Sequence, residues 1–175
     1  MDYEKLTQVM RELSLIAGDK IMEIYGRDDF DVKSKSDDSP VTEADEAADA
    51  LISEGLRAAF PDVLLVTEEQ ADSHTLSADT FLIVDPLDGT TNYLHGMPHW
   101  AVSIALEHKG EVVSAVVYDP AKDEMFFAEK GQGAWLNDKT RLRVSGRSSM
   151  IESVFGTGIP FGGGKYLPAT LQDLA

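Results

Sequence analysis

One segment of the chain runs from an apolar strand directly into two carboxylates. Residues 82–92 read Leu-Ile-Val-Asp-Pro-Leu-Asp-Gly-Thr-Thr-Asn, and they place Asp85 and Asp88 at the end of the apolar run. Acids beside a buried strand are costly unless a partner neutralises them. A hard cation such as Mg²⁺ binds carboxylates, carbonyl oxygens, water and substrate phosphate. The segment therefore predicts a site for a cation and a phosphate.

The residues around these acids suit the same chemistry. Pro86 cannot donate to a sheet ladder, so strand pairing is expected to stop there, which could turn the Leu87 carbonyl toward the ion. Gly89 permits a positive φ or a close approach of the backbone. Thr90 or Thr91 is then expected to cap a helix whose free N–H groups face a phosphate.

Two further acidic groups stand at the ends of expected elements. Asp45 lies in the first turn of a second helix, and Glu68 and Glu69 follow a short apolar strand. If that strand lies next to the strand that ends at Asp85, these acids converge on one end of the sheet. Taken singly, Asp45 or Glu69 could equally be a helix cap or an exposed loop acid, because acids favour helix starts.

The spacing of the two aspartates argues against one common phosphatase chemistry. Haloacid-dehalogenase-type phosphatases end a strand in Asp-x-Asp-Gly-Thr, and the first Asp of that motif is the nucleophile. Here the residue two positions before Asp88 is Pro86. The pattern therefore favours attack by water on a metal-held phosphate over an aspartyl-phosphate intermediate.

The elements that must position these residues form a mixed pattern. Apolar residues at helical spacing predict one helix over residues 3–25 and a second that Thr42 caps and Pro61 ends. Alternating apolar residues over 100–107 and 111–118 predict a β-hairpin, with shorter strands after it. Two helices on a mainly antiparallel sheet indicate a layered α+β fold.

The overall charge restricts the partners that the protein can have. The 175 residues include 15 basic and 31 acidic side chains, for a formal net charge of −16. Such a surface repels nucleic acids and anionic membranes, so neither is an expected partner, and an anionic substrate needs a local cation. The chain has no cysteine, no signal-peptide pattern at its start and no apolar stretch long enough to cross a bilayer. These features predict a cytoplasmic protein.

Together the motifs resemble the inositol monophosphatase superfamily, the lithium-sensitive, Mg²⁺-dependent phosphatases with a layered α/β sandwich of the inositol monophosphatase and fructose bisphosphatase type. Residues 41–45 (Val-Thr-Glu-Ala-Asp) are similar to the family's Val-Thr-x-x-Asp. Residues 67–69 (Thr-Glu-Glu) resemble its Gly-Glu-Glu, with Thr in place of Gly. Residues 85–90 match its metal loop in full.

The resemblance implies a set of metal ligands. Glu68, Asp85 and the Leu87 carbonyl would bind one Mg²⁺ ion, and Asp85 with Asp88 would bind a second. Two metals bridged by Asp85 would lower the pKa of a bound water and stabilise the leaving oxygen of an in-line displacement.

The resemblance also implies catalytic and substrate-binding roles. Asp45 and Thr90 would orient the attacking water, and Glu68 would join them as a catalytic residue through the metal it holds. The N–H groups of Gly89 and Thr90 would bind the phosphate. The residues expected to contact substrate are Leu87, Asp88, Gly89 and Thr90.

Two parts of the chain resemble different branches of the superfamily. Residues 33–45 are most similar to the phosphoadenosine-phosphate and histidinol-phosphate phosphatases, whereas residues 90–99 resemble the inositol monophosphatase branch. The second stretch lies beside the metal loop, so it favours inositol monophosphate or a similar small polyol phosphate as substrate. A phosphoadenosine-phosphate phosphatase is the alternative.

Members of the family continue past this length and carry a Trp-Asp-x-Ala-Gly motif, whose Asp completes the second metal site. Neither Trp100 nor Trp135 is followed by Asp. We therefore expect a metal-binding phosphatase domain over residues 1–150, and over 151–175 only the start of a truncated α/β domain. A third interpretation is a fragment without turnover that binds metal or self-associates through uncapped sheet edges, for example as a homodimer.

Overall fold

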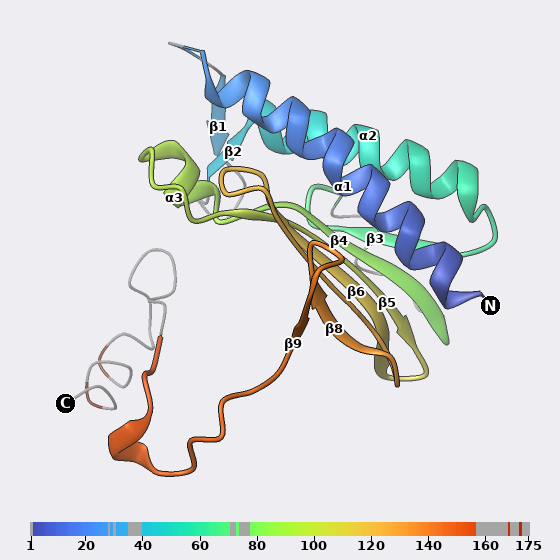
Figure 1. The fold of residues 1–175 in the computed structure, drawn as a ribbon. Coiled ribbons are helices and arrows are strands. Elements are labelled where there is room, and N and C mark those ends of the chain that lie inside the picture. Colours follow the sequence, from blue (N-terminus) through green and yellow to red (C-terminus); the bar gives the residue numbers. More distant parts are fainter. Residues whose placement is uncertain are drawn as a thin grey trace. The chain divides into compact units, whose positions relative to one another are not determined.

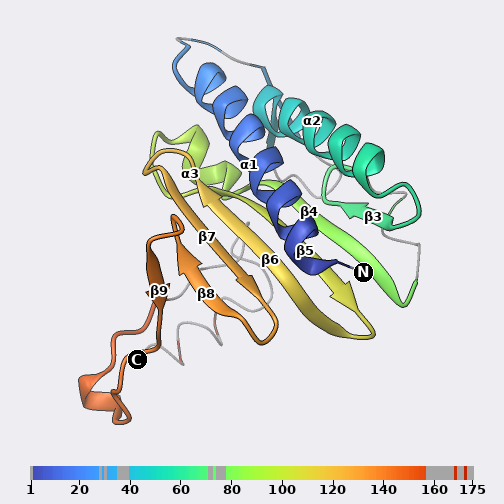
Figure 2. The same cartoon turned by 45° about the vertical axis from the view of Figure 1, so that its right-hand side comes forward.

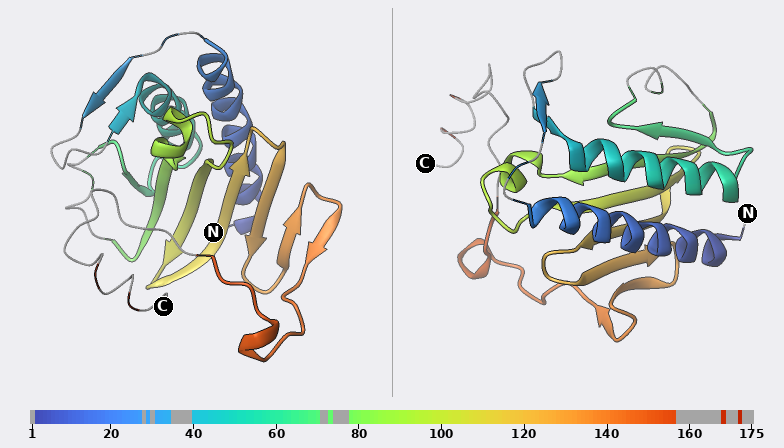
Figure 3. Two further views of the ribbon diagram at one scale, coloured as in Figure 1. Left: turned by 90° about the vertical axis from the view of Figure 1, so that its left-hand side faces the viewer. Right: turned by 90° about the horizontal axis from the view of Figure 1, so that it is seen from above.

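The two long helices of the protein lie side by side on one face of a sheet (Figures 1 and 3). The structure is a computed structural model that describes residues 2–27, 29, 31–34, 40–70, 73, 78–156, 168 and 172. Helix α1 (Tyr3–Tyr25) begins at Asp2, whose side chain accepts from the Lys5 N–H at 3.1 Å. Helix α2 (Glu43–Ala59) begins at Thr42. Both helices confirm the sequence prediction.

The main sheet has seven strands in the order β3-β4-β5-β6-β7-β8-β9 (Figure 2). Strands β3 and β4 are parallel, and every later neighbour is antiparallel. The mainly antiparallel sheet with two helices is therefore confirmed. The strands are β3 (Leu64–Thr67), β4 (Thr80–Asp88), β5 (Ala101–His108), β6 (Glu111–Asp119), β7 (Glu124–Glu129), β8 (Gly133–Leu136) and β9 (Thr140–Leu142).

Two smaller features border the main sheet. Strands β1 (Val32–Ser34) and β2 (Pro40–Thr42) form an antiparallel pair, and β2 leads directly into α2. The short helix α3 (Thr90–Leu94) follows β4. These elements bring the start of α2 and the end of β4 to the same side of the molecule (Figure 1).

The core lies between the helices and the sheet, because alternate residues of the strands face α1 and α2. Val102, Ile104 and Leu106 of β5 are fully buried at every second position. A buried hydrogen bond of 2.7 Å between the hydroxyls of Thr7 and Ser114 joins α1 to β6. These two buried hydroxyls are thus paired across the helix–sheet interface, which offsets the cost of their desolvation.

Strand β4 is longer than the sequence predicts. Its pairing with β3 ends at Val84, but its pairing with β5 lapses after Asp85 and resumes where Asp88 lies opposite Ala101. The expectation that pairing stops at Pro86 is therefore wrong for the β5 side. Pro86 lies in an irregularity of the ladder between Asp85 and Asp88, where no N–H donor is needed. The strand can therefore continue past the proline.

The chain divides into two compact units, Met1–Leu142 and Arg143–Ala175. The described part of the second unit contains a short 3-10 helix, η2 (Met150–Glu152), and exposed apolar side chains such as Ile151 and Phe155. Most of the predicted second domain at residues 151–175 lies outside the described residues, so its boundary stays a prediction. Within the described part, no helix combines the length and apolar character needed to span a membrane.

The packing of α1 on β6 yields a stability prediction. A Cβ at Gly18 would lie 2.6 Å from Cε1 of Tyr118 and 2.9 Å from Cγ of Pro120. We expect Gly18→Ala to lower the free energy of unfolding by about 1–2 kcal/mol, because overpacking outweighs the gain of roughly 1 kcal/mol in helix propensity. Urea denaturation measures the change.

The matched control is Gly26→Ala at the end of the same helix. There a Cβ would meet only backbone oxygens, the nearest being Met22 O at 3.5 Å, and φ is −79°. The control is expected to be close to neutral. Equal stability of the Gly18 and Gly26 variants would contradict the tight contact.

Candidate functional site

The predicted acids meet where β3 and β4 end. The two strands run in parallel with Thr67 opposite Val84, and the Glu68 N–H donates to the Val84 carbonyl at 3.0 Å. Glu68 therefore leaves β3 directly beside Asp85 of β4. The expectation that these strands are neighbours, and that their terminal acids converge, is confirmed.

Glu68 and Asp85 interact through their carboxyl groups. Burial, the charge of Glu68, a hydrogen bond with Glu68 and the charge of Asp88 together raise the pKa of Asp85 to about 8. The Leu87 N–H donates to Asp85 Oδ1 at 3.2 Å and opposes this rise only weakly. Two carboxyl groups share a hydrogen bond only when one of them keeps a proton. The shared proton thus neutralises one of the two carboxylates, as a bound cation could also do.

Asp45 is completely buried at the start of α2. Its Oδ2 accepts from the Thr42 N–H at 2.8 Å and from the Thr42 hydroxyl at 2.5 Å, which completes a capping box. Its Oδ1 accepts from the Thr90 hydroxyl at 2.9 Å. Burial raises the pKa of Asp45, and these hydrogen bonds only partly oppose the rise. Asp45 is therefore a helix cap and also a partner of the β4–α3 connection.

Thr90 links Asp45 to the predicted metal loop. Its hydroxyl lies 2.9 Å from Asp45 Oδ1 and 3.2 Å from the Leu87 carbonyl oxygen. Its single proton favours the carboxylate, which is the stronger acceptor. The Leu87 carbonyl then keeps its lone pairs for another partner. The hydroxyl oxygen of Thr90 likewise keeps lone pairs that can accept from an incoming water.

The prediction that Thr90 or Thr91 caps helix α3 is wrong. The N-cap is Gly89, at φ 98°, and no side chain caps this helix. The Thr90 hydroxyl is already engaged with Asp45. Gly89 is needed for a close approach of two backbone segments, because a Cβ there would lie 3.0 Å from His99 O. Contact of the Gly89 and Thr90 N–H groups with a phosphate stays a prediction.

The donor set suits a hard cation, although the site is not a preformed cage. In the part of the chain that the structure describes, no three Asp, Glu or His side chains are grouped closely enough to hold an ion. Asp88 lies exposed at the end of β4. Glu68, Asp85 and the Leu87 carbonyl nonetheless present only oxygen, the ligand type that Mg²⁺ prefers, and the carboxyl pair already needs a neutralising charge.

Two residues near this site, Asp49 and Gln70, were not predicted from the sequence. Asp49 of α2 is only 6% exposed, and it accepts a hydrogen bond from Gln70, two residues after Glu68. The available signal was a polar residue four positions after Asp45 within the apolar face of a helix.

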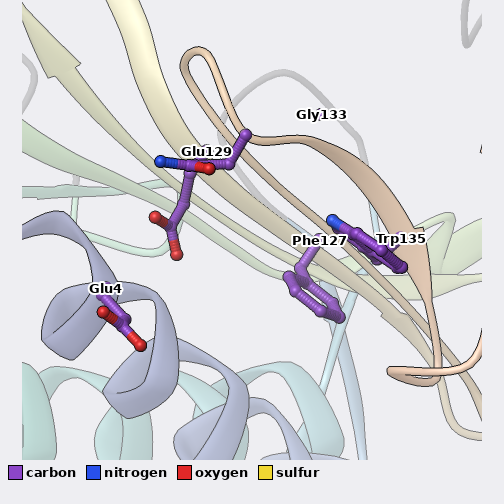
Figure 4. Close-up of a pocket in the computed structure, with 6 residues that line it drawn as sticks. Glu4, Phe127, Glu129, Gly133 and Trp135 are labelled. Atoms are coloured by element: carbon purple, nitrogen blue, oxygen red, sulfur yellow. The ribbon is translucent and has the colours of Figure 1, made fainter. Parts of the chain in front are cut away.

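A groove elsewhere in the described part lies between α1 and the β7–β8 hairpin (Figure 4). Glu4 and Glu129 lie at one end of it, and the rings of Phe127 and Trp135 lie at the other. Its lining residues are Glu4, Phe127, Glu129, Gln132, Gly133 and Trp135. The lining includes two carboxylates, and the guanidinium groups of Arg11 and Arg141 lie against the rings of Phe127 and Trp135.

The layered α+β fold thus places carboxylates at the ends of two parallel strands, with a partly buried Asp–Thr pair beside them. The chain belongs to the inositol monophosphatase family, whose model matches residues 2–165. The resemblance to this family is thereby confirmed.

Relatives of the chain bear two different names. It is 43% identical over 167 residues to the inositol-1-monophosphatase of Rhizobium meliloti, covering 93% of this chain and 62% of that protein. It is 45% identical over 148 residues to the Nus factor SuhB of Pseudomonas aeruginosa, covering 83% and 54%. The crystal structure of the extragenic suppressor protein SuhB from Bartonella henselae superposes with a TM-score of 0.74 at 41% identity, covering 82% and 55%. The chain thus spans little more than half the length of these proteins.

The carboxyl pair yields a prediction for the metal-free protein. The pKa of Asp85 is higher in the folded chain than in the unfolded chain, so Asp85 costs stability progressively as pH rises from about 4 toward 8. We expect Asp85→Asn to raise the melting temperature at pH 8 in EDTA, by roughly 2–4 °C for each kcal/mol of relieved repulsion. The gain should vanish near pH 4. Differential scanning calorimetry at both pH values tests this, and a lower melting temperature at pH 8 would contradict it.

Proposed function

We propose that the protein is a Mg²⁺-dependent phosphomonoesterase that hydrolyses inositol monophosphate or a similar small polyol phosphate. The observation that carries this proposal is the Glu68–Asp85 carboxyl pair beside the partly buried Asp45–Thr90 hydrogen bond. Family membership supports it, because the inositol monophosphatase family is metal-dependent. The name of the Rhizobium meliloti relative supports inositol monophosphate as the first substrate to test.

Under this proposal each acid at the end of β4 holds cations. Glu68, Asp85 and the Leu87 carbonyl would hold one Mg²⁺, and Asp85 with Asp88 would contribute to a second. A bound Mg²⁺ lowers the pKa of its water and offsets the charge of the phosphate. Local positive charge is needed because the protein carries a net charge of −16, which repels an anionic substrate.

Asp45 and Thr90 would orient the attacking water. Since the proton of Thr90 is directed at Asp45 Oδ1, the Thr90 oxygen faces an incoming water as an acceptor. Burial raises the pKa of Asp45, which makes its carboxylate a better proton acceptor at neutral pH. Thr42 fixes the other oxygen of Asp45, so the pair keeps its orientation before substrate arrives.

Residues 1–150 would form the metal-binding domain, and residues from 151 onward would begin a second α/β domain. A role as a Nus factor, the name that the SuhB relatives bear, is the alternative. The net charge of −16 argues against direct contact with a nucleic acid backbone, so we favour the phosphatase.

Phosphate release separates the substrate candidates. Inorganic phosphate is measured from inositol monophosphate and from phosphoadenosine phosphate, each with Mg²⁺ and with EDTA. We expect Mg²⁺-dependent release that is faster from inositol monophosphate. Faster release from phosphoadenosine phosphate would transfer the assignment to the nucleotide branch. No release from either substrate would favour the fragment without turnover.

A second prediction separates the role of Asp45 from that of the metal ligands. Asp45→Asn is expected to lower kcat by about 10²- to 10⁴-fold, the usual range for a lost proton acceptor, while Mg²⁺ affinity changes little. Asp62→Asn in the exposed α2–β3 turn is the matched control and should leave kcat unchanged. An equal loss of Mg²⁺ affinity and kcat in Asp45→Asn would show that Asp45 acts as a ligand instead.

A further inference from the structure

Glu68 lies in a tight turn that is closed by hydrogen bonds. The Gln70 N–H donates to the Thr67 carbonyl at 3.3 Å and to the Thr67 hydroxyl at 3.2 Å. Glu68 and Glu69 are thus the two central residues of a four-residue β-turn. Ser73 packs behind the turn, and its hydroxyl donates to the Gln70 carbonyl at 2.6 Å. The direction of the Glu68 side chain therefore depends on how this turn is held.

The side chain of Gln70 ties the turn to helix α2. Its amide Nε2 donates to Asp49 Oδ2 at 2.7 Å and lies 3.3 Å from the Ser53 hydroxyl oxygen. Its amide oxygen accepts from the Arg57 guanidinium at 2.9 Å. Both ends of one amide are thus engaged by three side chains of the same helix.

These side chains belong to a regular stripe along α2. Asp45, Asp49, Ser53 and Arg57 follow one another at intervals of four residues, so they share one face of the helix. The first member bonds Thr90, and the other three bond Gln70. A single helix face therefore contacts both halves of the proposed site.

Asp49 is buried, and its burial costs more free energy than packing alone would justify. It is 6% exposed, and its Oδ1 has no hydrogen-bond partner among the described residues. A carboxylate that is removed from water with one oxygen unpaired costs free energy that an apolar side chain at this position would avoid. In the described part, no group of acids that could bind an ion includes Asp49. Among the described residues, the side chain of Asp49 reaches another element through its bond to Gln70.

We propose that Gln70, anchored by Asp49, is a positioning residue that aims the Glu68 carboxylate at Asp85. The inference rests on the proposed function, since it assigns Gln70 a role toward the Mg²⁺ that Glu68 and Asp85 would hold. Glu68 is itself exposed to solvent. The link from the Gln70 side chain to α2 adds to the hydrogen bonds that close the turn and ties its position to the helix. Partners that orient metal ligands in this way contribute about 10- to 100-fold to metal affinity.

Isothermal titration calorimetry with MgCl₂ on the 175-residue chain tests the proposal without an activity assay. Gln70→Ala is expected to weaken Mg²⁺ binding about 10- to 100-fold. Gln132→Ala in the exposed β7–β8 turn, the matched control, should bind as the wild type does. Asp49→Ala should reproduce the loss, and Asp49→Asn, which keeps an oxygen acceptor for Gln70, should restore most of the affinity.

The outcomes distinguish a failure of the positioning role from a failure of the proposed phosphatase function. If the wild type binds Mg²⁺ and Gln70→Ala binds equally well, the positioning role is wrong and the proposed function stands. If the wild type does not bind Mg²⁺, the proposed function fails and this inference fails with it. A lower melting temperature with unchanged Mg²⁺ affinity would show a purely structural role and overturn the proposal.

Should Gln70→Ala fail to fold, Gln70→Glu keeps the length of the side chain and sets a carboxylate against Asp49. An added negative charge near a cation strengthens its binding by simple attraction. The positioning role predicts weaker Mg²⁺ binding in spite of that attraction, and it predicts recovery when Asp49→Asn is added. Tighter binding in Gln70→Glu would overturn the proposal.

Discussion

The parallel pairing of β3 and β4 forces two carboxyl groups together, and the rest of the site depends on this constraint. Thr67 lies opposite Val84 in the parallel pair. Each of these residues is followed by an acid, so Glu68 lies next to Asp85. Burial and mutual repulsion hold the pKa of Asp85 far above its usual range. A protein keeps such a pair only where something positive offsets it. A proton does so in the free chain, and a hard divalent cation can replace it.

Helix α2 is the element that relates this carboxyl pair to the rest of the site. Asp45 in its first turn caps the helix through Thr42 and also holds Thr90. The helix-cap and functional interpretations of Asp45 are therefore compatible, because its two oxygens serve different partners. One turn later, Asp49 reaches Gln70 beside the β3 terminus. A helix is rigid over this distance. A shift of α2 at either contact would therefore displace both Thr90 and Gln70, and with them both halves of the site.

Patterns with a local cause were predictable from the sequence. The Asp2 and Thr42 caps and the two helix lengths follow from spacing and side-chain chemistry within a few residues. The N-cap at Gly89 was not predictable, because a distant carboxylate takes the Thr90 hydroxyl. Nor was the bond from Gln70 to Asp49, which joins residues 21 positions apart that share no periodic pattern. The convergence of Glu68 and Asp85 was predictable only as a condition on strand order, which the structure satisfies.

Anomalous diffraction from crystals of the protein grown with Mn²⁺, which prefers the same oxygen ligands as Mg²⁺, tests the central claim most directly. Our account predicts an anomalous peak at roughly 2.1 Å from carboxylate oxygens of both Glu68 and Asp85, with their mutual hydrogen bond broken. It also predicts that the Thr90–Asp45 bond persists. A Glu68–Asp85 hydrogen bond that survives at saturating Mn²⁺, with the ion bound elsewhere or not at all, would contradict the account.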